Sequence, residues 1–127
     1  MAIEITEDIR FGLEAASEAR SHLERLEGAI PERKLQELSL AVSELVTNSV
    51  KYSGGPDSEP ISLRVTLGDG LVRAEVYDHG FGFEKPSAIS PSGQAGGKGL
   101  YIVDTISESW GVSREGSRFC VWLELRW

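Results

Sequence analysis

The hydrophobic pattern in the first half of the chain predicts two helices. Over residues 35–52 the apolar side chains recur every three or four positions, which places them on one broad face of an α-helix. The same spacing over 9–26 predicts an earlier helix that Gly28 ends, with a short edge strand over 2–6 before it. Pro31 suits the first turn of the second helix, where a backbone N–H has no helical partner.

The second half of the chain changes to the alternation that is typical of β-strands. Apolar and polar residues alternate over 61–67 and 71–78, and a Gly-Asp-Gly turn joins these segments into a hairpin. A third helix is expected to begin at Gly99, and a second hairpin follows from 110–114 and 119–127.

This order of elements predicts an α+β fold. Because the strands come in adjacent antiparallel pairs, the helices cannot each cross between parallel strands. We therefore expect a two-layer α/β sandwich, with helices on one face of a mixed, mostly antiparallel sheet, formed by a single domain over residues 1–127. Trp110, Trp122 and Trp127 are expected in the core or at an interface rather than against a ligand.

The charge balance narrows the classes of partner. The chain has 13 basic and 20 acidic side chains, and its formal net charge of −7 disfavours nonspecific binding to nucleic acid or to an anionic membrane. The single cysteine, Cys120, excludes an internal disulfide and a zinc site built from several cysteines. The acidic N-terminus does not resemble a signal peptide and no apolar run is long enough for a membrane span, so we expect a cytoplasmic protein.

A first polar cluster lies on the predicted helix over 35–52. Glu44 and Asn48 are one turn apart outside its apolar face, and Lys51 lies on the same side. A carboxylate above a carboxamide suits a site that holds a hydrated cation and accepts a proton. On its own, such a pair is more often a solvated helix face.

Two further clusters flank the longest stretch without periodicity. Residues 78–82 (DHGFG) leave a strand, so a carboxylate is followed by backbone that can lie flat against a planar ring. Residues 96–100 (GGKGL) enter a helix, whose free N–H groups and positive dipole end attract anions. Turn geometry explains either glycine cluster alone, but not why both flank one loop. Together the three clusters indicate a nucleotide with Mg²⁺.

These runs resemble the sequence boxes of a known group of ATPases. Residues 43–52 (SELVTNSVKY) resemble the N-box, 78–82 the first glycine box and 97–100 the second glycine box of the GHKL (Bergerat) ATPases, which include gyrase, heat-shock chaperones, histidine kinases and mismatch-repair proteins. The phrases SELVTN and GKGLYIVD resemble those of the anti-sigma-factor serine/threonine kinases of bacteria. The resemblance covers about residues 10–126 and implies the GHKL sandwich fold.

The resemblance also implies a role for each box residue, with ATP and Mg²⁺ as the cofactors. Asn48 would be a Mg²⁺ ligand, and Asp78 would accept a hydrogen bond from the adenine amino group. Glu44 would be the catalytic base that takes the proton from a partner's hydroxyl. The other cofactor-binding residues would be Lys51, Gly80, Gly82, Gly97, Lys98, Gly99 and Leu100, and residues 83–96 would be the ATP lid.

Two residues depart from the family pattern. Cys120 stands where the family often has a threonine that bonds the adenine side, which implies weaker nucleotide binding, although Ser117 is near it in the sequence. Tyr52 stands where many relatives have histidine, and the sequence predicts no effect for this change.

The resemblance leaves two main functions open. The first is an ATP-dependent protein serine/threonine kinase and anti-sigma factor, which would sequester a sigma factor and phosphorylate an anti-anti-sigma partner of the STAS type. The second is a non-catalytic nucleotide-binding module that regulates transcription by sequestering a partner. A histidine kinase catalytic domain or a stand-alone ATPase is less expected, because no phospho-acceptor hairpin or transducer domain is evident. Relatives also imply a homodimer, through the first helix or the open face of the sheet.

Overall fold

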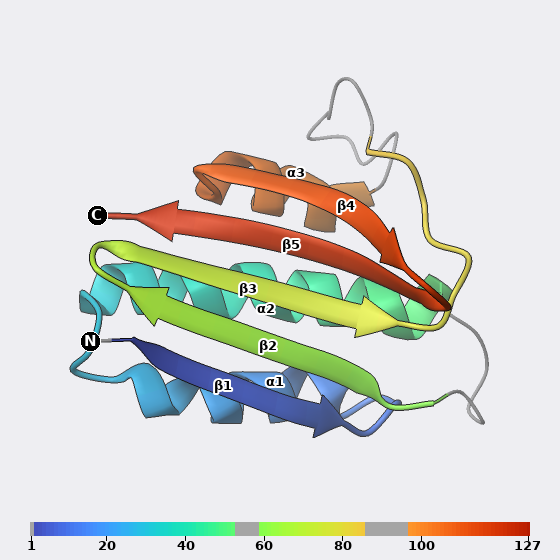
Figure 1. The fold of residues 1–127 in the computed structure, drawn as a ribbon, viewed down its shortest axis with the longest axis horizontal. Coiled ribbons are helices and arrows are strands. Elements are labelled where there is room, and N and C mark those ends of the chain that lie inside the picture. The colour runs from blue at the N-terminus through green and yellow to red at the C-terminus, as the bar shows by residue number, and fades with distance from the viewer. Residues whose placement is uncertain (1, 53–58, 86–96) are drawn as a thin grey trace.

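The computed structural model of the chain describes residues 2–52, 59–85 and 97–127 (Figure 1). Its strands and helices follow one another in the predicted order. They are β1 (Ile3–Ile9), α1 (Ala15–Leu23) with a short 3₁₀ turn (Glu24–Leu26), α2 (Glu32–Tyr52), β2 (Ile61–Gly68), β3 (Leu71–Asp78), α3 (Gly97–Ile106), β4 (Ser109–Glu115) and β5 (Arg118–Arg126).

The five strands form one sheet in the order β1-β2-β3-β5-β4. Each of the four pairings is antiparallel, so these strands form a more uniform sheet than the mixed one that the sequence predicted. Strand β5 lies between β3 and β4. In its register with β3, Asp78 at the end of β3 pairs with Phe119 near the start of β5. The register therefore places the end of the first hairpin beside the turn of the second.

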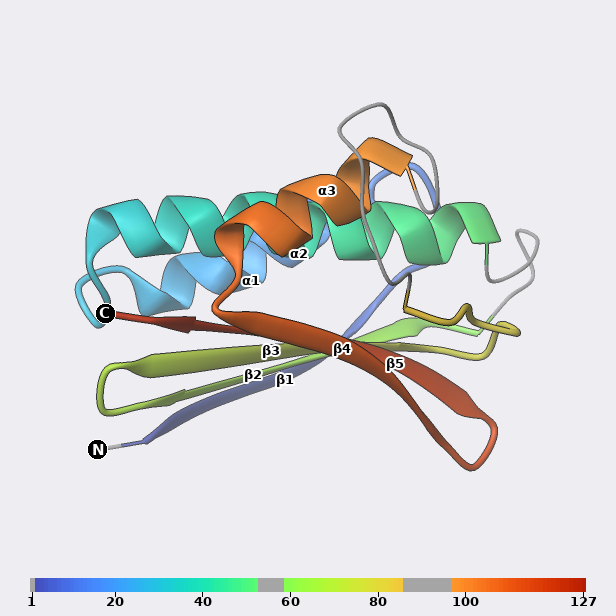
Figure 2. The same cartoon turned by 90° about the horizontal axis from the view of Figure 1, so that it is seen from above.

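All three helices cover the same face of this sheet, as Figure 2 shows. The apolar alternation of the strands supplies one side of the core, and the apolar arc of α2 supplies the other, with Leu38, Val42 and Val46 fully buried. This arrangement confirms the predicted α+β sandwich. None of the helices in the described part of the chain is long and apolar enough to cross a membrane.

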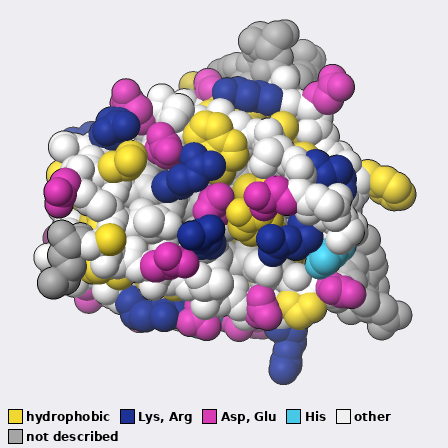
Figure 3. Space-filling view, in the orientation of Figure 1, with side chains coloured by type: hydrophobic (Ala, Val, Ile, Leu, Met, Phe, Trp, Pro, Cys, Tyr) yellow, Lys and Arg dark blue, Asp and Glu magenta, His cyan; other side chains and the backbone are white. Residues whose placement is uncertain are grey.

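The opposite face of the sheet has no helix on it and carries mixed charges among hydrophobic side chains (Figure 3). Arg73 lies 4.3 Å from the centroid of the Trp122 ring and donates a hydrogen bond of 3.0 Å to Glu124. Trp122 thus packs on this open face, whereas Trp110 is buried in the core and Trp127 is exposed. Trp110 therefore occupies the predicted core, and an interface position for Trp122 and Trp127 stays a prediction.

The N-terminal segment differs from its prediction. Strand β1 extends to Ile9, where the sequence predicted that a helix would already have begun. Ile5 and Ile9 are four residues apart, a spacing that fits one face of a strand as well as one face of a helix, and pairing of Ile9 with Ile61 on β2 decides for the strand. The helix begins only at Ala15, and Leu13, predicted on its apolar face, is fully exposed.

A charged cluster joins β1 to the turn after α1. The Glu7 carboxylate accepts a hydrogen bond of 2.5 Å from Arg25, and His22 lies 3.9 Å from the same oxygen. The hydrogen bond from Arg25, helped by the charges of Arg25 and His22, lowers the pKa of Glu7. A carboxylate with a lowered pKa stabilises the folded state above its unfolded pKa, and this contribution is lost as the pH falls through the folded pKa.

We therefore expect Glu7→Gln to lower the melting temperature at neutral pH and to have less effect as the pH falls below the ordinary glutamate pKa of 4.5. Thermal unfolding of the wild type and the variant, from neutral pH down to about pH 3, measures this difference. Glu14→Gln, at an exposed position, controls for the loss of one negative charge. A difference between wild type and Glu7→Gln that stays constant over the whole pH range would show that the ion pair does not cause it.

Candidate functional site

One end of the molecule brings together three segments that are far apart in the sequence. The C-terminal end of α2, the end of β3 and the start of α3 lie at the same end in Figure 2. Helix α2 packs against α3 as well as against β3 and β5, which fixes the relative positions of these segments. All three of the predicted polar clusters therefore lie close to one another.

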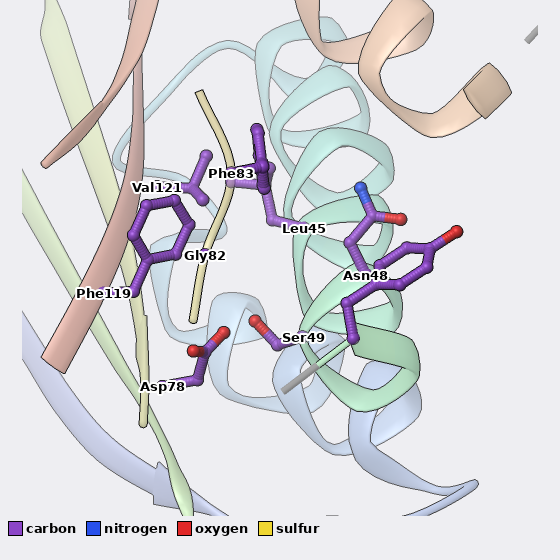
Figure 4. Close-up of a pocket in the computed structure, with 9 residues that line it drawn as sticks. Leu45, Asn48, Ser49, Asp78, Gly82, Phe83, Phe119 and Val121 are labelled. Atoms are coloured by element: carbon purple, nitrogen blue, oxygen red, sulfur yellow. The ribbon is translucent and has the colours of Figure 1, made fainter. Parts of the chain in front are cut away.

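A small cleft lies between α2 and the strands β3 and β5 (Figure 4). Its walls are mostly apolar, with a few polar groups among them, which is the composition expected of a site for a small organic ligand. The lining residues are Leu45, Asn48, Ser49, Tyr52, Asp78, Gly82, Phe83, Phe119 and Val121.

Asp78 is the acidic group of this cleft and is only 7% exposed. Its Oδ1 accepts a hydrogen bond of 2.8 Å from the backbone N–H of Gly80, which uses one of the roughly four acceptor positions of a carboxylate. Figure 4 shows the carboxylate of Asp78 and the hydroxyl of the buried Ser49 pointing toward each other from β3 and α2. A buried carboxylate needs polar partners, so this position suits a ligand that donates hydrogen bonds.

The first glycine box packs directly on Phe119. Gly82 has a φ of +76°, and a Cβ at this position would overlap the Phe119 ring. Phe83 meets the same ring edge to face, with 5.3 Å between the ring centroids. Only glycine allows the backbone to approach an aromatic ring this closely in this conformation, so the loop backbone itself forms a wall of the cleft.

The second glycine box packs directly on the polar side of α2. A Cβ at Gly99 would lie 2.8 Å from Oε2 of Glu44 and 3.6 Å from Nδ2 of Asn48. The absence of a side chain at Gly99 therefore lets the first turn of α3, whose N–H groups have no partner within the helix, come against the Glu44 and Asn48 pair. This arrangement combines an anion-binding helix end with a carboxylate and a carboxamide.

Asn48 fits a Mg²⁺ ion that is bound together with phosphate. No group of three or more His, Cys, Asp or Glu side chains that could hold a metal occurs in residues 2–52, 59–85 and 97–127. Asn48 offers one amide oxygen, and Mg²⁺ commonly takes only one or two protein ligands when phosphates and water supply the others. The donor set thus suits Mg²⁺ with a nucleotide, and does not suit a metal held by the protein alone.

Most of the predicted residues meet at this end of the molecule. Asn48, Asp78 and Gly82 line the cleft, Gly80 bonds to Asp78, and Glu44 and Gly99 are in contact beside it.

The remaining predicted residues are placed differently. Lys51 is exposed and does not line the cleft, and the Leu100 side chain is buried in the core, so Leu100 could meet a ligand only through its backbone. Gly97 and Lys98 are the first residues of α3, but the surroundings of the Lys98 side chain lie outside the described part of the chain. Of the predicted lid, residues 86–96 also lie outside it.

The sequence did not reveal the apolar half of the cleft. Leu45 and Ser49 fall on the arc of α2 that predicts a core, and Phe119 and Val121 fall on the inward side of an alternating strand. A hydrophobic core and the apolar lining of a binding cleft produce the same sequence pattern, so the sequence does not separate them. An available signal was Ser49, a buried hydroxyl on a mostly apolar arc, which is a position that demands a polar partner.

Cys120 does not line the cleft, so the structure shows no contact through which this residue would weaken nucleotide binding. Alternation along β5 turns Phe119 and Val121 toward the helices, so Cys120 lies on the open face, where it pairs with Tyr77 and Ser113. Burial raises the pKa of its thiol to about 11, so the group is neutral at physiological pH.

Tyr52 does line the cleft, at its mouth, and is 69% exposed.

Comparison with known proteins agrees with this geometry. A family model described as a histidine kinase-like ATPase domain matches residues 9–127. The chain therefore belongs to the histidine kinase-like ATPase domain family, and this confirms the class of protein that the three sequence boxes indicated. No curated protein matches the chain significantly.

Two solved structures share the fold. The RsbU and RsbW domains of Rv1364c from Mycobacterium tuberculosis superpose with a TM-score of 0.73 at 22% identity, covering 98% of this chain and 32% of that chain. The histidine kinase AdeS from Acinetobacter baumannii gives a TM-score of 0.52 at 14% identity, covering 96% of this chain and 67% of that chain. The present chain thus spans about a third of the Rv1364c chain. At these identities the similarity shows a common fold.

We expect Gly82→Ala to destabilise the protein more than Gly116→Ala. Both glycines have a positive φ, which costs an L-residue about 1–2 kcal/mol, but only Gly82 has the Phe119 ring in the way of a Cβ. Nothing lies within 4 Å of the Cβ position at Gly116, so this variant measures the backbone penalty alone. Urea unfolding of both variants gives the comparison, and equal losses would contradict the close packing of Gly82 on Phe119.

Proposed function

We propose that this member of the histidine kinase-like ATPase family binds ATP with Mg²⁺ and acts as a protein serine/threonine kinase and anti-sigma factor. It would sequester a sigma factor and phosphorylate an anti-anti-sigma partner of the STAS type. The observation that carries the proposal is the meeting of Glu44 and Asn48 with the start of α3, directly beside the cleft that contains Asp78.

The cleft supports adenine as the base. Asp78 offers acceptor positions to an exocyclic amino group, and the Ser49 hydroxyl, which can donate and accept, lies across from it. Leu45 and Val121 line the same space and provide apolar surface for the faces of a planar ring. An adenine amino group would give Asp78 the hydrogen-bond donor that its burial calls for.

The neighbouring polar surface supports the phosphates. The first N–H groups of α3 bind negative charge, and Gly99 lets them do so close to Asn48. The Asn48 amide oxygen would hold Mg²⁺, and this ion, when bound, would neutralise charge on the phosphates.

Glu44 is the residue that a kinase requires and a simple binding module does not. We assign it as the general base, which takes the proton from the serine or threonine hydroxyl of the partner. The hydroxyl oxygen then forms a bond to the γ-phosphorus as the bond from that phosphorus to the leaving ADP oxygen breaks. The half-buried position of Glu44 against the start of α3 supports this role, because the transferred group would lie at the same helix end.

The choice of partners rests on two supports. The SELVTN and GKGLYIVD phrases resemble the anti-sigma-factor kinases of bacteria, and the fold is shared with a structure that contains an RsbW domain. A cytoplasmic location and a homodimer would accompany this function.

We expect Glu44→Gln to bind Mg-ATP within about twofold of the wild type but to transfer phosphate to its partner at least about 100-fold more slowly, which is the usual contribution of a general base. Radiolabelled ATP and purified STAS-type partners measure the transfer, and calorimetry measures the binding. Glu37→Gln, on the same helix, is the matched control and should transfer phosphate at the wild-type rate.

Two results would overturn parts of the proposal. Transfer by Glu44→Gln at the wild-type rate would remove Glu44 as the base. Tight Mg-ATP binding by the wild type without transfer to any partner would instead favour a non-catalytic module that acts by sequestration.

A further inference from the structure

An arginine on the edge strand holds the backbone of the first glycine box. Nη2 of Arg114, on β4, donates hydrogen bonds to the carbonyl oxygens of Gly80 at 2.9 Å and Phe81 at 2.7 Å. A charged donor to a carbonyl forms a stronger hydrogen bond than a neutral one does. The loop after Asp78 is therefore fastened to a strand that is two positions away in the sheet.

The sheet register explains how Arg114 reaches this loop. Arg114 pairs with Phe119 on β5, and Phe119 pairs with Asp78 on β3, so the three residues form one row across the sheet. Directly opposed residues in antiparallel strands point to the same face, which is here the face of the cleft. The guanidinium carbon of Arg114 lies 5.7 Å from the centroid of the Phe119 ring, on its way to the loop.

The loop needs such a support because its own side chains hold it poorly. The Phe81 side chain is fully exposed, and the glycines at 80 and 82 have no side chain to pack. Glycine-rich backbone has many accessible conformations, and fixing one of them costs conformational entropy. The Asp78 carboxylate holds the N–H of Gly80, the Phe119 ring meets Gly82, and Arg114 holds the two carbonyl groups between them.

Holding the carbonyl groups also sets the direction of the next two amides. In a trans peptide the C=O and the following N–H point in opposite directions, and the described chain has no cis peptide bond. Bonds from Arg114 to the oxygens of Gly80 and Phe81 therefore fix the N–H groups of Phe81 and Gly82 as well. Since Gly82 lines the cleft, the orientation of this backbone determines the shape of the base site.

From these contacts we infer that Arg114 is a positioning residue for the base of the nucleotide. It keeps the first glycine box in the conformation that receives the ring, without touching the ring itself. This inference rests on the proposed nucleotide-binding function, and it adds a residue that lies outside all three sequence boxes.

Loss of Arg114 should weaken nucleotide binding without unfolding the protein. If the loop then adopts the competent conformation about a tenth of the time, the apparent affinity falls about tenfold. Arg114 acts on the side of the site that receives the base, so its loss should lower the affinities for ATP and ADP by the same factor. In a phosphotransfer assay the KM for ATP should rise while kcat at saturating ATP stays unchanged.

We would test this with Arg114→Ala, Arg114→Lys and the control Arg118→Ala, using calorimetric titration with Mg-ATP and Mg-ADP. Arg118 is on the same hairpin but stacks over Tyr77, 4.2 Å from its ring centroid, on the open face of the sheet. Arg114→Ala should raise both dissociation constants about tenfold with an unchanged urea midpoint. Arg114→Lys should recover part of this loss, because an ammonium group can donate to both carbonyl oxygens. Arg118→Ala should bind as the wild type does.

The outcomes separate the role of Arg114 from the proposed function. If the wild type binds nucleotide, and the dissociation constants of Arg114→Ala and Arg114→Lys both lie within twofold of the wild-type values, the role of Arg114 alone is overturned. If Arg114→Ala binds nucleotide more weakly, has a much lower urea midpoint and is not recovered by Arg114→Lys, Arg114 stabilises the fold in general. This result would also overturn its role as a positioning residue. A wild-type protein that binds neither nucleotide would overturn the proposed function, and the role of Arg114 with it.

Discussion

The buried carboxylate of Asp78 is the constraint on which this end of the molecule depends. A carboxylate that is 7% exposed loses most of its hydration, so the surrounding structure must supply hydrogen-bond donors. The chain meets this need in part by folding the following glycine back, so that the Gly80 N–H bonds to Asp78. The rest of its hydrogen-bond acceptor capacity faces the cleft. A polar group among apolar lining residues is a feature of ligand-binding sites.

The sheet holds this carboxylate in place from a distance. The β3-β5-β4 register aligns Asp78, Phe119 and Arg114, and these residues fix respectively the start, the wall and the backbone direction of the first glycine box. Glycine at 82 and 99 then allows backbone to approach where any side chain would collide. Helix α2 and strands β3 and β5 thus supply most of the residues that line the cleft, and the segment after Asp78 adds Gly82 and Phe83.

The sequence correctly predicted those segments whose hydrophobic periodicity fits only a helix or only a strand. The predicted strand over 71–78 and the predicted helix over 35–52 agree with the structure because the two-residue period of a strand and the 3.6-residue period of a helix are distinct. The prediction for the N-terminal segment was wrong because the spacing of Ile5 and Ile9 fits both a helix and a strand. Only the long-range pairing with β2 decides between the two. A single exposed arginine such as Arg114 has no pattern at all, and its importance emerges only when the sheet places it beside Gly80.

The most direct test of this account is the ¹H–¹⁵N spectrum of the labelled protein with and without Mg-ATP. We expect shifts at Ser49, Asp78, Gly80 and Gly82 that saturate together, with little change at Arg73 and Trp122 on the open face of the sheet. A spectrum that is unchanged at millimolar Mg-ATP, or changes that centre on the open face, would contradict the claim that the Asp78 cleft is a nucleotide site.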